Sequence, residues 1–345
     1  MSSGGAVQQA TLDVRADAFP LDVEVAPRLG ARIFLHQVAA PESAVSVGTP
    51  HLPGWCWSYA SRGLEAFGQR EVIFTLPVAT TTGDPGRPPT DPLRFFATLL
   101  GLASQGRVVH AGGLTALGGA GFMGRPGIAY APAHPVDGVD VAPGALWMLA
   151  ITAEEVEVHN AFGQARLLTS LGRASTFYPY PPWSDLRRAA VSSPQTMQGS
   201  ILAQIPRVTP GAMARMRDGA LSLQLRPDAA RLMAQVFAQL APESPYALLT
   251  EIDPAADGCL VWQAGQHAPA AIAPSGSAGQ SLAGCFVAVV PQQSEEGAQV
   301  FEDGFAFFGG QRSIEALRTA ISARQRLELG ASSGRMPLSL EWPGN

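Results

Sequence analysis

The glycine segment at residues 119–124 is the first feature of this chain that could perform chemistry. Gly119-Ala120-Gly121-Phe122-Met123-Gly124 has the spacing of a dinucleotide-binding loop, in which a helix begins at the third glycine and points its N-terminus at a pyrophosphate. Here Arg125-Pro126-Gly127 follows at once, and then the strand-like Ile128-Ala129-Tyr130. We therefore predict a glycine-rich hairpin or loop and no bound nucleotide.

A second pattern, Gly279-Gln280-Ser281-Leu282-Ala283, approaches the nucleophile elbow of serine hydrolases. It lacks the last glycine, and it precedes a strand, whereas an elbow joins a strand to a helix. Ser281 is therefore predicted to be an ordinary loop serine.

Carboxylates gather beside a histidine at residues 154–159. Glu154, Glu155 and Glu157 lie close in sequence to His159, and a histidine next to carboxylates can act as a general base. A hydrolase or transferase using His159 with Glu154, Glu155 or Glu157 is thus the alternative function, while a solvated surface explains the same run without chemistry.

Metal-binding and redox patterns are missing from the sequence. The six histidines form no i,i+4 pair and no cluster with cysteine or acid, and three cysteines are too few and too scattered for a disulfide framework or a zinc knuckle. We expect buried thiols, no metal and no cofactor.

Composition favours a folded protein with a sizeable core, since 46% of the residues are hydrophobic and 15% are charged. The net charge of −5 argues against nucleic acid or an anionic membrane as partner. The N-terminus shows no basic region followed by an apolar run, and no stretch is apolar and long enough for a membrane span. We expect a cytoplasmic protein.

Alternating and aromatic stretches predict strands at residues 21–25, 31–38, 55–59 and 71–76. Asp91-Pro92 resembles a helix cap and first helical residue, followed by an apolar stripe. A strand followed by a capped helix recurs at 220–225 with Asp228, and at 305–308 with Ser313. The predicted class is α+β: two packed halves with mainly antiparallel or mixed sheets, flanked by a few helices.

The segment Phe177-Tyr178-Pro179-Tyr180-Pro181-Pro182-Trp183, called the strap below, sets four aromatic residues among three prolines. Proline fixes φ and drives its predecessor to extended geometry, so a stiff, non-helical segment is predicted. It can lie across a core or present a binding ledge, and we expect its rings to pack on the sheet of the first half. The predicted domains are residues 1–195, ending just after the strap, and 196–345.

Charge is unevenly distributed after the strap. Residues 186–217 hold five arginines and no acid, whereas residues 232–311 hold eight acids and no arginine or lysine. The two stretches can lie on separate solvated faces or pair with each other, or the arginines can attract an acidic partner. Arg187 and Arg188 stand next to the strap and are the first candidates for either role.

Short matches in a constant order resemble known scaffold proteins. They run WSYASRGL (57–64), QREVI (69–73), FF (95–96), FMG (122–124), LLTSLG (167–172), YPYPPWS (178–184), VFEDG (300–304) and SIEALR (313–318). Together they resemble the C-terminal region of the Smad-anchor (SARA) and endofin scaffold proteins. The first half also resembles suppressor-of-fused domains, whose bacterial members include immunity proteins of toxin systems. The zinc-binding FYVE finger of the scaffolds is missing, so lipid binding and Smad recruitment are not carried over.

The resemblance implies a non-catalytic module that binds another protein or a peptide segment, in bacteria as an immunity-type inhibitor or a scaffold. We expect it to hold the segment in a groove between the halves. The candidate binding residues are Tyr178, Tyr180, Trp183, Arg187 and Arg188, because aromatic residues and arginine dominate binding hot spots. An acidic segment would suit the two arginines.

Overall fold

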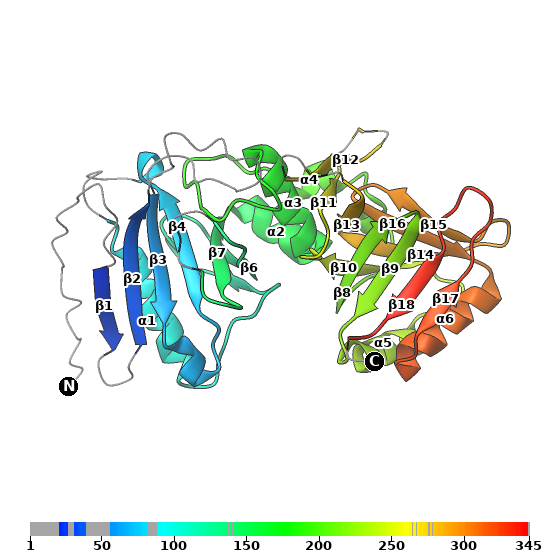
Figure 1. Ribbon diagram of the computed structural model, residues 1–345, viewed down its shortest axis with the longest axis horizontal. Helices are drawn as coiled ribbons and strands as arrows, with labels where there is room; N and C mark the ends of the chain where they lie inside the picture. The colour runs from blue at the N-terminus through cyan, green and yellow to red at the C-terminus, as the bar shows by residue number, and fades with distance from the viewer. Residues whose placement is uncertain are drawn as a thin grey trace. The chain divides into compact units, whose positions relative to one another are not determined.

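The structure is a computed structural model that describes residues 21–26, 31–38, 56–81, 88–136, 139, 141–263, 265–266, 268–274, 277 and 279–343. The chain forms two compact units, shown in Figure 1: unit 1 is Met1–Val156 with Pro182–Ala190, and unit 2 is Glu157–Pro181 with Val191–Asn345. The chain therefore enters unit 2 inside helix α2 (Ala153–Phe162) and returns to unit 1 for residues 182–190. A boundary between folding domains at residue 195 stays a prediction.

Unit 1 is built on a seven-stranded sheet with the order β1-β2-β3-β4-β7-β6-β5. Only β4 and β7 pair in parallel among these neighbours. The strands are β1 (Leu21–Ala26), β2 (Ala31–Val38), β3 (Cys56–Arg62), β4 (Val72–Pro77), β5 (Leu114–Ala116), β6 (Gly127–Pro132) and β7 (Leu146–Ile151). The four predicted strands are confirmed, with residue 55 outside the described residues.

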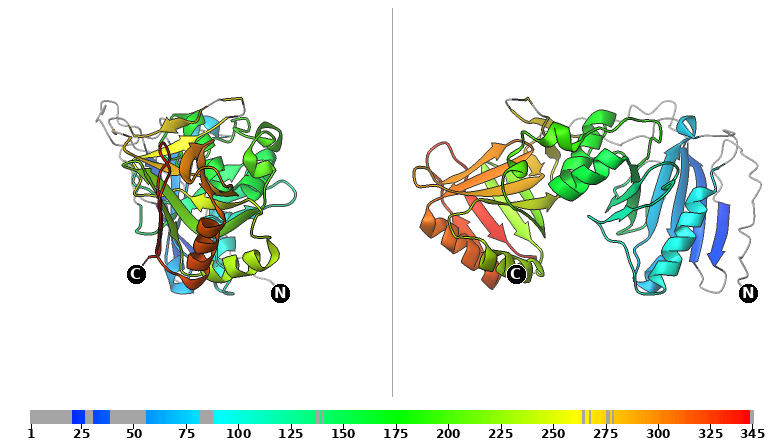
Figure 2. Two further views of the ribbon diagram at one scale, coloured as in Figure 1. Left: turned by 90° about the vertical axis from the view of Figure 1, so that its right-hand side faces the viewer. Right: turned by 180° about the vertical axis from the view of Figure 1, so that it is seen from behind.

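Helix α1 (Asp91–Ala103) covers one face of this sheet, as the view from behind in Figure 2 shows. It buries Phe96, Leu99 and Leu100 in a core that includes Phe74 of β4. The predicted cap is off by one residue: Thr90 is the N-cap and Asp91 is already helical, since Pro92 needs no amide partner in the first turn. Short 3-10 turns span Leu64–Phe67 and Val78–Thr80.

Unit 2 is built on an eleven-stranded mixed sheet with the main order β12-β11-β13-β8-β10-β14-β16-β15, and β9, β18 and β17 branch off β8. The pairs β8–β10, β11–β13, β14–β16 and β9–β18 are parallel. The strands are β8 (Arg207–Arg217), β9 (Ala220–Leu225), β10 (Tyr246–Glu251), β11 (Gly258–Val261), β12 (Ala270–Ile272), β13 (Ser281–Gly284), β14 (Phe286–Pro291), β15 (Gly297–Phe301), β16 (Gly304–Gly309), β17 (Leu327–Leu329) and β18 (Leu338–Glu341).

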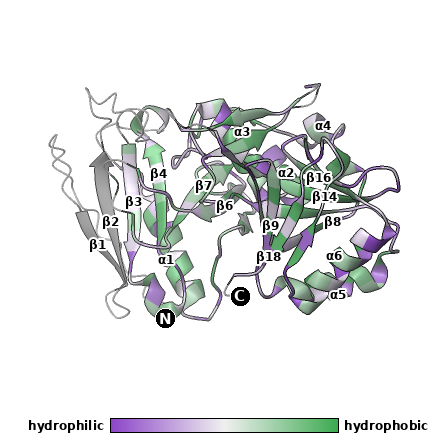
Figure 3. Cartoon of the chain, turned by 45° about the vertical axis from the view of Figure 1, so that its right-hand side comes forward, coloured by the Kyte–Doolittle hydropathy of each residue, from purple (hydrophilic) through white to green (hydrophobic). Residues whose placement is uncertain are grey.

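Helices α5 (Ala229–Gln239) and α6 (Gln311–Ala323) lie side by side on this sheet and close its core. Figure 3 shows that α6 carries apolar and polar residues on different sides, as a helix covering a sheet should. Asp228 is the N-cap of α5, as predicted. The predicted cap of α6 is wrong: Gly310 takes that place, and the Ser313 hydroxyl instead donates to the Glu296 carboxylate.

Two adjacent helices before the strap were not predicted, α2 and α3 (Gln164–Ser175). The strap itself is neither helix nor strand, and the short α4 (Pro194–Met197) and a 3-10 turn at Ile201–Ala203 follow it. Helices and mixed sheets confirm the α+β class. Among the described residues, the helices lack the length and apolar character that crossing a membrane would require.

Candidate functional site

Residues 182–188, called the ledge below, form a fixed surface segment of unit 1. Ser184 holds the ledge to the sheet: its amide donates to the carbonyl of Thr75 at 2.8 Å, and its hydroxyl oxygen accepts the amide of Ala150 at 2.9 Å. Leu186 packs against the unit 1 core. These contacts position the ledge without help from a helix or a strand.

Arg125 fixes the other end of the ledge. Its guanidinium donates to the carbonyl oxygens of Asp185 at 3.3 Å, Leu186 at 2.6 Å and Arg188 at 2.8 Å. Burial, followed by the neighbouring charge of Arg188, lowers the pKa of Arg125. Three backbone acceptors on one guanidinium leave the ledge little conformational freedom.

Arg188 forms an ion pair with Glu155 inside unit 1. Its guanidinium pairs with both oxygens of the buried Glu155, one of them at 2.8 Å. Glu155 also accepts the amide of Thr152 at 2.9 Å. The sequence offered the acids at 243–303 as internal partners of this arginine, but the carboxylate that it meets is Glu155.

The same pair bears on the alternative function as a hydrolase or transferase. Glu155 is buried and saturated by Arg188 and Thr152, whereas Glu154 and Glu157 are exposed. The geometry thus gives Glu155 a structural role. No group of three or more His, Cys, Asp or Glu side chains in the described part of the chain could hold a metal ion.

Arg187 is the exposed residue of the ledge, while Trp183, Asp185, Leu186 and Arg188 are partly accessible. The Arg187 amide donates to the Asp185 carboxylate at 2.8 Å, and its guanidinium contacts the Thr81 carbonyl at 3.2 Å. A tryptophan and an arginine are thus presented on a segment whose backbone is already fixed.

Tyr178 and Tyr180 belong to unit 2, unlike the other three predicted residues. The Tyr178 hydroxyl donates to the Ala256 carbonyl at 2.8 Å, and its ring packs against Cys259. Tyr180 is only 3% exposed. The expectation that the strap packs its rings on the first-half sheet is wrong for Tyr178, because the chain changes units between Pro181 and Pro182.

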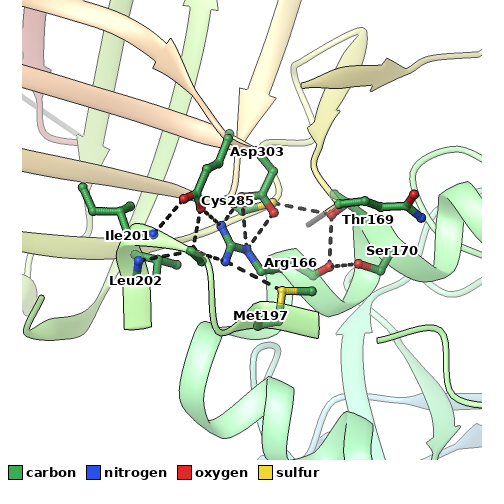
Figure 4. A network of polar contacts seen from close by, with 12 residues as sticks. Arg166, Thr169, Ser170, Met197, Ile201, Leu202, Cys285 and Asp303 are labelled. Atoms are coloured by element: carbon green, nitrogen blue, oxygen red, sulfur yellow. Dashed lines mark hydrogen bonds and ion pairs between the residues drawn. The ribbon is translucent and has the colours of Figure 1, made fainter. Parts of the chain in front are cut away.

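Unit 2 contains a buried charge network that the sequence analysis missed (Figure 4). Arg166 of α3 is fully buried, and its Nε donates to Asp303 at 2.8 Å. Its other two nitrogens reach Glu302 at 2.9 Å and the Ser200 hydroxyl at 2.7 Å. One side chain therefore ties α3 to the β15–β16 turn and to the start of the 3-10 turn at Ile201–Ala203.

The charge on Arg166 is retained in spite of burial. Burial alone would lower the pKa of this guanidinium, but Asp303 and Glu302 outweigh it and raise the pKa above its ordinary value. The rings of Phe162, Trp262 and Phe286 lie 5.4–5.9 Å from the guanidinium carbon. The sequence contains one indication of this buried arginine, because Arg166 interrupts the apolar run Ala165-Arg166-Leu167-Leu168.

The glycine segment, Ser281 and the three cysteines were the other candidates of the sequence analysis. The segment 119–124 forms turns that lead into β6, not a helix, so the predicted loop is confirmed. The prediction that Ser281 lies in a loop is wrong, because Ser281 is buried as the first residue of β13. Cys56, Cys259 and Cys285 are buried free thiols, as predicted, and burial raises the pKa of Cys56 and of Cys259 to about 12.

Among solved structures, the chain is similar to the crystal structure of Drosophila Suppressor of Fused. The match covers 90% of this chain and 88% of that one, with 12% sequence identity and a TM-score of 0.35. No family model matches the chain, and no curated protein sequence matches it significantly. A likeness at this level does not assign a family, and the resemblance to the Smad-anchor and endofin scaffolds stays a prediction.

Proposed function

We propose that this chain is a non-catalytic protein-binding module and that the ledge contacts the partner. The observation that carries the proposal is the fixed presentation of Trp183 and Arg187 on residues 182–188. Tryptophan and arginine are the side chains most enriched at binding hot spots. A backbone already held by Ser184 and Arg125 lowers the entropic cost of association.

The partner surface best suited to the ledge is an acidic segment with an apolar residue beside the acid. The exposed Arg187 guanidinium can donate to a carboxylate in bidentate geometry, and the partly accessible Trp183 offers apolar area on the same segment. In this proposal the protein acts as an immunity-type inhibitor or as a scaffold. The partner distinguishes the two, because an inhibitor must protect cells from a toxin that it binds.

The test is a pair of charge reversals in unit 1, Arg187→Glu on the ledge and Arg94→Glu on α1, both at exposed positions. Once a partner has been isolated from the native host, stopped-flow association is measured at several salt concentrations. Arg187→Glu should slow association at least tenfold and remove its salt dependence, whereas Arg94→Glu should leave both unchanged. Equal effects of the two substitutions would refute a specific role for the ledge.

Trp183→Ala supplies the second arm of the test. It should accelerate partner dissociation while the fold persists, since the ring is only half-buried. Arg188→Glu is unsuitable for this experiment, because it would place a second carboxylate against the buried Glu155 and unfold unit 1. A partner that dissociates from Trp183→Ala at the wild-type rate would show that the ring is outside the interface.

A further inference from the structure

Unit 2 contains a surface pocket that none of the roles above uses. Its volume is about 410 Å³, within the range of small-molecule sites. Helix α3 supplies Arg173 and Ala174, α4 supplies Thr196 and Met197, and Trp262 follows β11. All of these residues lie in unit 2, so the pocket is independent of the ledge.

The buried Arg166 network contacts the apolar wall of the pocket, which Met197 and Trp262 form. Met197 and Trp262 are 3% and 8% exposed, and both also contact Arg166 of the buried network. The Met197 sulfur lies 3.9 Å from an Arg166 nitrogen, and the Trp262 ring centre lies 5.6 Å from its guanidinium carbon. Since Arg166 is itself fixed by two carboxylates, this wall is formed before any ligand arrives.

Arg173 gives the pocket its charge. Within the described part of the chain its guanidinium has one polar contact, a long 3.4 Å bond to the neutral amide oxygen of Gln266, and no carboxylate there pairs with it. The two nearest buried acids in the network, Glu302 and Asp303, do not line the pocket. Their oxygens already accept from Arg166, from Ser200 and from the Ile201 amide.

We propose that this pocket binds a small monocarboxylic acid whose apolar group lies on Trp262 and Met197 while its carboxylate pairs with Arg173. A single arginine matches a single negative charge, and its planar fork fits a carboxylate in bidentate geometry. The apolar wall favours an aromatic or aliphatic body over a polar one.

The first experiment uses the full chain and two probes of the same shape, 4-phenylbutanoate and 4-phenylbutanol, titrated by calorimetry. The acid should bind at least tenfold more tightly than the alcohol. Neither probe binding, or equal affinity for both, would overturn the proposal.

Three variants locate the site. Arg173→Gln should remove the preference for the acid, while Arg312→Gln, at an exposed arginine of α6, should leave it intact. Ala174→Trp, which adds a large ring at an exposed position on the pocket rim, should abolish binding of both probes without lowering the melting temperature. A preference for the acid that survives Arg173→Gln, or acid binding that survives Ala174→Trp, would place the carboxylate elsewhere and refute this site.

Discussion

Arg166 is a fully buried cation that pairs with Glu302 and Asp303 inside unit 2. Arg166→Met removes the cation and leaves Glu302 and Asp303 buried with no compensating charge. The expected loss is about 3–5 kcal/mol of unfolding free energy. Chemical denaturation measures this loss.

The matched control for that substitution is Arg226→Met. Arg226 pairs with Glu251 at 3.2 Å, but its side chain is 52% exposed, so its removal should cost about 1 kcal/mol or less. A loss for Arg166→Met no larger than that of the control would mean that the buried acids become protonated or hydrated at little cost, and the network would then contribute specificity without stability.

At the residue scale, the sequence identified the surface arginine but not the buried one. Arg187 stands out because its run holds no acid, and it is indeed exposed. Arg166 and its partner Asp303 are 137 residues apart, and a contact at that separation leaves no trace in local spacing. The partner of Arg188 was missed for the same reason, since Glu155 is 33 residues away on another element.

The glycine turn before β6 provides a matched pair of substitutions at the element scale. Gly119 and Gly121 both have positive φ, 62° and 66°. A Cβ at Gly119 would meet nothing within 4 Å, whereas one at Gly121 would lie 2.2 Å from the backbone oxygen of Arg125. Gly119→Ala should cost roughly 1–2 kcal/mol of unfolding free energy through the backbone conformation alone.

Gly121→Ala should cost a further ~1–3 kcal/mol, because the turn backbone must move to relieve the clash. Thermal unfolding followed by near-ultraviolet circular dichroism compares the two variants, and equal melting temperatures would contradict the tight turn described here. Neither variant should change nucleotide binding, which we expect to be undetectable in the parent protein as well.

Elements with a clear apolar pattern were predictable. The apolar run of β4 and the apolar stripe of α1 each predicted the right element, because a strand buried throughout favours a continuous run and a helix that covers a sheet favours a stripe at helical spacing. Helix α2 was missed because three glutamates in its first half suggest a surface run. Helix α3 was missed because its segment 167–172 was interpreted only as one of the matches that carry the resemblance. The N-caps of α1 and α6 were predicted wrongly. In both helices the observed N-cap residue makes no capping hydrogen bond through its side chain, so the sequence gives little indication of where the helix begins.

At the scale of the whole molecule, the predicted cut after residue 195 can be tested with fragments. Residues 196–345 hold all eleven strands of the second sheet but lack α3, and therefore lack Arg166. Residues 153–345 keep both. We expect the longer fragment to give a dispersed proton–nitrogen NMR spectrum and the shorter one to give the narrow spectrum of an unfolded chain, because Glu302 and Asp303 lose their cation.

A dispersed spectrum from residues 196–345 would contradict this expectation. It would show that α3 and its arginine dock onto a sheet that is already folded, and the boundary predicted from the sequence would then be the correct one for folding.

The separation between Arg166 and Asp303 also sets an order of events during synthesis. The ribosome adds about 5–20 residues per second, so the guanidinium leaves the peptidyl-transferase centre roughly 7–27 s before the carboxylate that neutralises it exists. Throughout that interval α3 exposes a cation and the apolar side chains around it. Residues 182–190, in contrast, complete unit 1 while most of unit 2 is still untranslated. The nascent chain is therefore most exposed to chaperones and proteases between residue 190 and residue 303, and slow codons in that interval would lengthen the exposure.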